Sequence, residues 1–89
     1  MTLNFPNRSR SFDQRNNYVR FWGHDGAMEI AFFLETAALK ILNPTLPNEQ
    51  RELLTEFDKS LARIHEVAEK VYRRSKPGSH ACTITAHNF

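Results

Sequence analysis

The sequence predicts an α+β domain, in which an antiparallel β-hairpin and a C-terminal strand form a small sheet covered on one face by two helices. Three observations predict this fold class. Residues 18–34 resemble two apolar strands around a turn, residues 54–71 carry a helical apolar stripe, and the last ten residues alternate as a strand. With 89 residues, 40% of them hydrophobic, the chain suffices for one core. Residues 1–89 are therefore predicted to form a single domain, with residues 1–15 as an N-terminal arm that can add a short strand.

The turn of the hairpin is predicted at Asp25-Gly26, because both residue types tolerate the positive φ of tight turns. A two-residue loop at these positions pairs Phe21 with Ile30. A four-residue loop that begins at the preceding glycine pairs Phe21 with Met28 instead. Both loops leave the same residues on one apolar face of the sheet. That face consists of Val19, Phe21, Met28, Ile30, Phe32 and Leu34.

His24 and Asp25 stand side by side in this loop and invite comparison with a catalytic pair. A catalytic base needs its target within hydrogen-bond reach and a third group that orients it. The spacing of the sequence supplies no such group. The two residues are interpreted as part of the turn.

The opposite face of the hairpin is expected to carry aromatic and charged side chains. Its residues are Tyr18, Arg20, Trp22, Ala27, Glu29, Ala31 and Phe33. Arg20 and Glu29 are expected to form a surface ion pair across the strands. One interpretation is that the N-terminal arm covers Trp22, through Leu3, Phe5 or Phe12. The other is an exposed platform of aromatic and arginine side chains, on which bases stack or a partner docks.

Two helices are predicted after the hairpin. A short helix follows Thr36 and ends before Pro44, since the residue before a proline disfavours helical geometry. A long amphipathic helix is predicted from Asn48 to Arg74, and at 1.5 Å per residue it measures about 40 Å. Its stripe consists of Leu54, Phe57, Leu61, Ile64, Ala68 and Val71. Strands of about eight residues span only about 27 Å, so the overhang predicts a diagonal crossing or a second copy, and hence a homodimer.

The closing residues "HACTITAHNF" alternate between apolar and polar positions, as an amphipathic strand does. Cys82, Ile84 and Ala86 point one way and are expected to join the apolar face of the hairpin. The predicted result is an antiparallel sheet of three strands or more.

Metal, cofactor and membrane sites are not predicted. The four histidines and the single cysteine have no spacing typical of zinc ligands, and the chain has no phosphate-binding glycine loop. No apolar run approaches the roughly 18 residues of a membrane span, and the N-terminus lacks the apolar run of a signal peptide. One cysteine also excludes an internal disulfide. A cytoplasmic protein is expected.

Basic residues gather in two segments of the chain. Four precede the hairpin or lie in its first strand: Arg8, Arg10, Arg15 and Arg20. Four more lie at the end of the long helix: Lys70, Arg73, Arg74 and Lys76. Cations at a helix C-terminus are stabilising on their own. If the arm folds against that end, the two groups form one basic patch able to contact phosphates.

The stretches "LNFPNRSRSFD", "VRFWGHDGAMEIAFFLE", "FDKSLARIHEVAEKVYRR" and the closing "NF" resemble the small bacterial proteins of domain of unknown function 1488. The matching positions are Phe5, Pro6, Asn7, Arg10, Ser11, Phe12, Asp13, Arg20, Phe21, Trp22, Gly23, Asp25, Gly26, Glu29, Arg63, Ile64, His65 and Tyr72. The resemblance covers nearly the whole chain. It implies a compact α+β domain and a bacterial cytosolic protein, and it implies no activity.

Three functional hypotheses follow. The leading one is a non-enzymatic, self-associating binding module that uses the Trp22 face and the basic helix end. Its candidate binding residues are Arg10, Phe12, Asp13, Arg20, Trp22, Glu29, Arg63 and His65. The second is a nucleic-acid-binding protein with Arg8, Arg10, Arg73 and Arg74 on phosphates, and Lys70 and Lys76 nearby. The third is a small enzyme around Glu29, Arg63 and His65, which requires one pocket holding all three.

Overall fold

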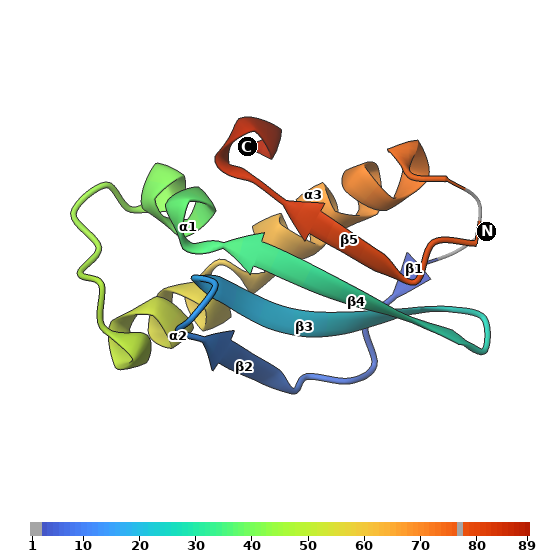
Figure 1. Cartoon of the computed structure of the whole chain (residues 1–89), viewed down its shortest axis with the longest axis horizontal. Helices are drawn as coiled ribbons and strands as arrows, with labels where there is room; N and C mark the ends of the chain where they lie inside the picture. The colour runs from blue at the N-terminus through green and yellow to red at the C-terminus, as the bar shows by residue number, and fades with distance from the viewer. Residues whose placement is uncertain (1–2, 77) are drawn as a thin grey trace.

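The computed structural model describes residues 3–76 and 78–89. It shows one β-sheet with helices packed against one of its faces (Figure 1). The strands in these residues are β1 (Leu3–Asn4), β2 (Arg10–Asp13), β3 (Tyr18–Asp25), β4 (Met28–Glu35) and β5 (Ala81–Ile84). The helices there are α1 (Thr36–Leu42), α2 (Gln50–Lys59) and α3 (Leu61–Arg74), and a short 3-10 turn, η1 (Ala86–Asn88), follows β5. The predicted α+β class is confirmed.

The hairpin of β3 and β4 is confirmed, but its register differs from both predictions. Phe21 lies opposite Phe32, so the turn is Gly26-Ala27. Gly26 has φ +61° and Ala27 does not have a positive φ. A two-residue turn with glycine first needs positive φ only at that glycine, which is the type II′ pattern. The register shift from the two-residue prediction is two residues, so the predicted apolar set stays on one face.

The N-terminal arm extends the sheet beyond β3. Both β1 and β2 pair antiparallel with β3, at its end and at its beginning respectively. The aromatic ring of Phe5 lies between them on the helix side, with its centroid 6.2 Å from that of Phe21 and 5.9 Å from that of Phe32. A Cβ atom added to Gly23 would lie 3.0 Å from ring carbons of Phe5 and Phe32. A glycine at this strand position therefore makes room for Phe5.

The last strand, β5, pairs parallel with β4, so the predicted antiparallel arrangement is wrong for this strand. The reason is the path of α3. Its last turn reaches the tip of the hairpin, where the hydroxyl of Tyr72 donates to the carboxylate of Asp25 over 2.6 Å. The chain therefore enters β5 at the end of the sheet where β4 begins, and both strands run in the same direction. Parallel strands need such a crossover connection.

The predicted long helix is divided at Ser60, which lies between α2 and α3 with φ −101° and ψ 16°. The Ser60 hydroxyl donates to the Glu56 carboxylate over 2.7 Å, and the amide of Ser60 donates to the carbonyl of Glu56 over 3.0 Å, so α2 and α3 follow each other directly. The bend lets each helix turn its own apolar side to the sheet. The whole molecule is 36 Å in its longest dimension, shorter than the predicted 40 Å rod. The continuous helix of about 40 Å on which the homodimer prediction rested is therefore not formed, and the homodimer itself stays a prediction.

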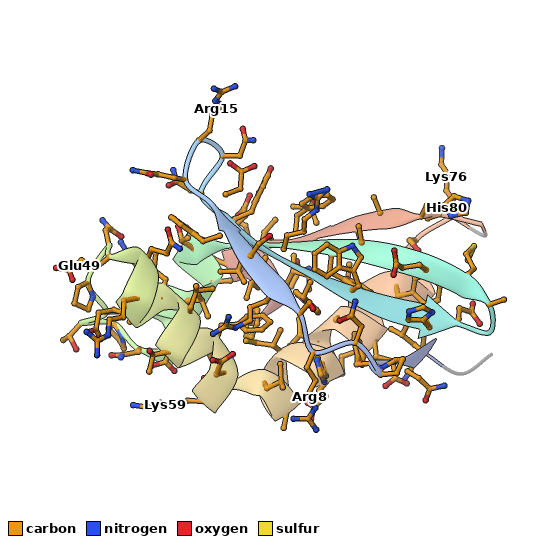
Figure 2. The ribbon with its side chains drawn as sticks, turned by 90° about the horizontal axis from the view of Figure 1, so that it is seen from below. Arg8, Arg15, Glu49, Lys59, Lys76 and His80 are labelled. Carbon is orange, nitrogen blue, oxygen red and sulfur yellow. The ribbon has the colours of Figure 1, made fainter. Side chains whose placement is uncertain are left out.

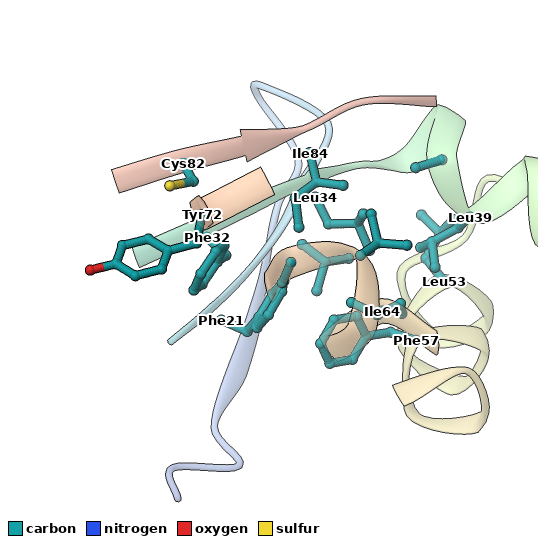
Figure 3. Packing of buried hydrophobic residues seen from close by; sticks show 14 of the residues in the cluster. Phe21, Phe32, Leu34, Leu39, Leu53, Phe57, Ile64, Tyr72, Cys82 and Ile84 are labelled. Carbon is teal, nitrogen blue, oxygen red and sulfur yellow. The ribbon is translucent and has the colours of Figure 1, made fainter. Parts of the chain in front are cut away.

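The core lies between the inner face of the hairpin and the helices (Figure 3). Phe21, Phe32 and Leu34 project from the strands toward Phe57 on α2 and Ile64 on α3. The predicted stripe is partly confirmed. Phe57, Ile64 and Ala68 are buried, whereas Leu54, Leu61 and Val71 lie at the margin of the core. The other buried apolar residues of α1, α2 and α3 are Ala38, Leu39, Leu53, Val67 and Tyr72.

Candidate binding surface

The face of the sheet that points away from the helices carries a cluster of three aromatic rings and one arginine. Tyr18, Arg20 and Trp22 alternate on β3, and Phe33 lies directly opposite Arg20 on β4. The guanidinium carbon of Arg20 is 5.6 Å from the ring centroid of Trp22 and 5.6 Å from that of Phe33. The rings of Tyr18 and Phe33 have centroids 5.6 Å apart. We refer to these four residues as the aromatic platform.

Residues 3–15 of the N-terminal arm, the part that the structure describes, do not cover the aromatic platform, so cover by Leu3, Phe5 or Phe12 is wrong. Phe12 lies opposite Val19, a core residue, and Phe5 packs on Phe21 and Phe32. Leu3 reaches to 3.1 Å from the Cβ position of Gly23, which is a buried residue of the inner side. All three arm residues thus lie on the helix side of the sheet. Trp22 is half-buried.

Carboxylates surround the aromatic platform. Asp13, Glu29 and Glu35 share its face by strand alternation. The predicted pair of Arg20 and Glu29 is wrong, because the two-residue shift places His24 opposite Glu29, with Nε2 and Oε2 3.7 Å apart. Arg20 is a positively charged residue on the same face as these carboxylates, which we refer to as the acidic rim.

Asp13 has a local structural role in addition to its place on the rim. Its carboxylate accepts hydrogen bonds from the side chain and the backbone amide of Asn16, at 2.8 and 3.1 Å. These bonds favour the ionised carboxylate and lower the pKa of Asp13. They hold the turn between β2 and β3, where Asn17 takes a φ of 57°.

His65 lies on the helix side of the sheet, stacked on Phe5 with ring centroids 3.8 Å apart and planes 5° from parallel. Hollows of about 160 and 540 Å³ flank it, and Arg8 lines both. Burial, and next the charge of Arg8, lower the pKa of His65. Neutral His65 therefore serves to fasten the arm to α3.

The three residues of the enzyme hypothesis lie apart. Glu29 is on the outer face of β4, and His65 lies under the inner face against Phe5. Arg63 is two positions from His65, which places it on the other side of α3. There it bonds Glu66 over 2.7 Å and lies 5.9 Å from the ring centroid of Phe89. No single pocket in the described part of the chain can hold residues so placed.

Several of the basic candidates are engaged in ion pairs. Arg10 binds Asp58 with two nitrogens, at 2.9 and 2.8 Å, and so joins β2 to α2. Arg73 bonds Glu69 over 2.7 Å, and Lys70 lies 3.9 Å from Glu66.

The two basic segments do not form one patch. Arg8 lies beside the first turn of α3, whereas Arg73 is in its last turn, about 18 Å along the helix axis. Figure 2 shows Arg8 and Lys76 projecting from opposite sides of the molecule.

Residues 3–76 and 78–89 contain no group of three His, Cys, Asp or Glu side chains placed to bind a metal ion. Cys82 is buried, and this burial raises the pKa of its thiol. Among the helices of the described residues, none is long and apolar enough to cross a membrane.

Sequence reasoning named Trp22 and Arg20 as binding candidates but omitted Tyr18 and Phe33 from that set. Alternation along the strands had placed both on the correct face. The missing signal was the register, because only the observed pairing puts Phe33 directly opposite Arg20.

Comparisons with known proteins identify the family. The family described as a protein of unknown function (DUF1488) matches residues 3–84. A crystal structure of a protein of unknown function from the DUF1488 family of Shewanella loihica PV-4 has the same fold, with a TM-score of 0.79. The two chains are 18% identical, and the match covers 94% of each. A search of curated proteins gave no match. Since the family match spans nearly the whole chain, this chain belongs to the DUF1488 family of proteins of unknown function.

Proposed function

We propose that this chain is a non-enzymatic binding module that docks a basic and apolar protein surface on the aromatic platform. The observation that supports this proposal is the composition of an uncovered sheet face. Three aromatic rings and an arginine lie together there, and the described helices pack on the other side. Tryptophan, tyrosine and arginine are the residues that most often dominate binding energy at protein interfaces.

The charge around the aromatic platform favours a basic partner. Asp13, Glu29 and Glu35 face the same side as the platform, which itself contains one cation, Arg20. Arg15 lies near Asp13, and His24 lies 3.7 Å from Glu29. Such a rim attracts lysine and arginine side chains and repels phosphates. The same rim disfavours a second copy placed face to face, because it brings like charges together.

The test uses Trp22, the sole tryptophan of the chain, as a fluorescent reporter of its own surface. Three probes are titrated: an amphipathic leucine–lysine peptide, its leucine–glutamate counterpart and a mixed-sequence single-stranded oligonucleotide. We expect a saturable change of Trp22 fluorescence with the leucine–lysine peptide alone. The affinity is expected to fall as salt is added, because salt screens the acidic rim.

Two variants locate the binding site. Phe33→Ala is expected to weaken binding of the leucine–lysine peptide about tenfold or more, since it removes one ring of the aromatic platform. Ile41→Ala is the matched control, because Ile41 is an apolar side chain 55% exposed on α1. It is expected to leave the affinity unchanged. Circular dichroism establishes that both variants are folded.

Three results would contradict the proposal. Binding of the oligonucleotide with a steep salt dependence would support the nucleic-acid hypothesis instead. A dimer in sedimentation that Trp22→Ala dissociates would assign the aromatic platform to a second copy. The absence of any response to the leucine–lysine peptide would remove the proposed partner chemistry.

A further inference from the structure

In the part of the chain that the structure describes, β5 is an edge strand and one of its sides faces no other strand. The amide of Ala31 donates to the carbonyl of His80 over 2.8 Å. In a parallel ladder this bond turns the backbone groups of Cys82 and Ile84 toward β4. The N–H and C=O groups of Ala81 and Thr83 therefore point away from the sheet, and both residues are exposed. They are available to another extended chain.

A groove runs beside this free edge. It encloses about 370 Å³ and is lined by Val71 and Arg74 of α3, Ser75 directly after α3, Ala81, Cys82 and Thr83 of β5, and Asn88 of η1. Figure 1 shows the end of α3, in orange, reaching past the edge of the sheet beside β5. An added strand would thus lie over α3. Its alternate side chains would contact the half-buried Val71 and the exposed Arg74.

Arg74 gives the groove a positive charge, and Lys76 follows two residues later in the chain. Arg74 and Lys76 are both exposed, and neither forms an ion pair with a carboxylate of the described residues. The two nearest carboxylates in sequence, Glu66 and Glu69, are already bonded by Arg63 and Arg73. Glu69 is also the last acidic residue of the chain. No carboxylate of the described residues pairs with Arg74, so its guanidinium is available to a carboxylate of a binding partner.

The strand β5 of a second copy does not supply a carboxylate for Arg74. Pairing of β5 with β5 of another copy would place beside the groove a strand, Ala81–Ile84, that carries no carboxylate side chain. Symmetric pairing would also place two basic segments near each other. The charge pattern favours an acidic partner over self-association at this edge.

We propose that this groove binds an extended acidic segment of a partner protein as an additional strand beside β5. The backbone groups of Ala81 and Thr83 pair with the segment. Arg74 binds one of its carboxylates, and Val71 contacts an apolar side chain on the same face of the segment. Strand addition of this kind takes its affinity from main-chain hydrogen bonds and its specificity from the flanking side chains. The site is separate from the aromatic platform.

The probe is a blocked eight-residue peptide of alternating valine and glutamate. Amide hydrogen exchange, measured by NMR, reports the backbone of Ala81 and Thr83 directly. At saturation we expect exchange of both amides to slow about tenfold or more, because each enters a hydrogen bond. A valine–lysine peptide is expected not to bind, and a peptide N-methylated at alternate residues is expected to lose binding.

Variants then separate the charge effect from the fold. Arg74→Glu is expected to abolish binding of the valine–glutamate peptide. Arg15→Glu is the matched control, since Arg15 is an exposed arginine in the turn between β2 and β3. Trp22→Ala is expected to bind the peptide normally, whereas Arg74→Glu is expected to leave the titration of the aromatic platform unchanged. Failure of one proposal is thereby distinguishable from failure of the other.

Equal binding of the valine–lysine or the N-methylated peptide would overturn the inference. So would unchanged exchange at Ala81 and Thr83 with saturating valine–glutamate peptide. Protection of these amides that rises with protein concentration alone would assign the edge to a second copy.

Discussion

Replacement of Gly23 by alanine tests the packing of the N-terminal arm. The new methyl group would lie 3.0 Å from ring carbons of Phe5 and Phe32 and 3.1 Å from a methyl carbon of Leu3. Overpacking of this kind costs about 1–3 kcal/mol. Alanine has less backbone entropy than glycine in the unfolded chain, and this difference stabilises the folded state by about 0.5–1 kcal/mol. The expected net loss in the free energy of unfolding is about 0–2.5 kcal/mol.

Urea unfolding followed by circular dichroism measures this loss. The same substitution is then made in a Phe5→Ala background, where one of the two close rings is absent. There Gly23→Ala is expected to cost about 1 kcal/mol less, because residues in contact are coupled. An equal cost in both backgrounds would refute the close approach of Phe5 to Gly23. An increase in stability in the wild-type background would refute the overpacking argument itself.

Two pH dependences follow from the structure. The hydrogen bond to Asp25 raises the pKa of Tyr72 to about 12 from 10, so stability is full below pH 10 and falls as the pH rises from 10 to 12. Tyr72→Phe is expected to flatten this alkaline loss in urea unfolding at several pH values, and an unchanged slope would contradict the bond. Burial lowers the pKa of His65 below 6.5, so the unfolded chain binds the proton more tightly and stability falls as the pH drops below 6.5. NMR titration of His65 measures whether its pKa is lowered. Phe5→Ala is expected to raise the pKa of His65, because it exposes the imidazole. An unchanged pKa would mean that the stacked Phe5 ring does not bury His65.

Local sequence patterns were sufficient for the hairpin and its inner face. Alternation of Val19, Phe21, Ile30, Phe32 and Leu34 predicts a common apolar side, and these residues are all buried. The register was not predictable to the same degree. Loops of either length preserve the parity of the faces, and the hydrophobic pattern depends on parity alone.

The direction of β5 and the division of the long helix depend on contacts distant in sequence. The apolar stripe continues through Ser60, so periodicity gives no sign of the bend. Only the packing of α3 beneath the sheet, with Tyr72 at Asp25, decides where the chain re-enters the sheet. Contacts distant in sequence also decided the candidate site. Arg10 was predicted as a binding residue, but it pairs with Asp58, which is 48 positions away and which local patterns could not identify as its partner.

The strand β5 has only four residues and is joined to β4 by the whole helical layer. Closure of so long a connection costs more chain entropy than closure of the tight hairpin turn. The hairpin is therefore expected to assemble early in folding, and β5 to join it last and to detach first when the molecule is heated or stressed. When β5 detaches, the backbone groups of β4 become exposed and can pair with strands of other molecules. A peptide bound in the groove beside β5 would hold β5 in place and so protect the protein against this aggregation.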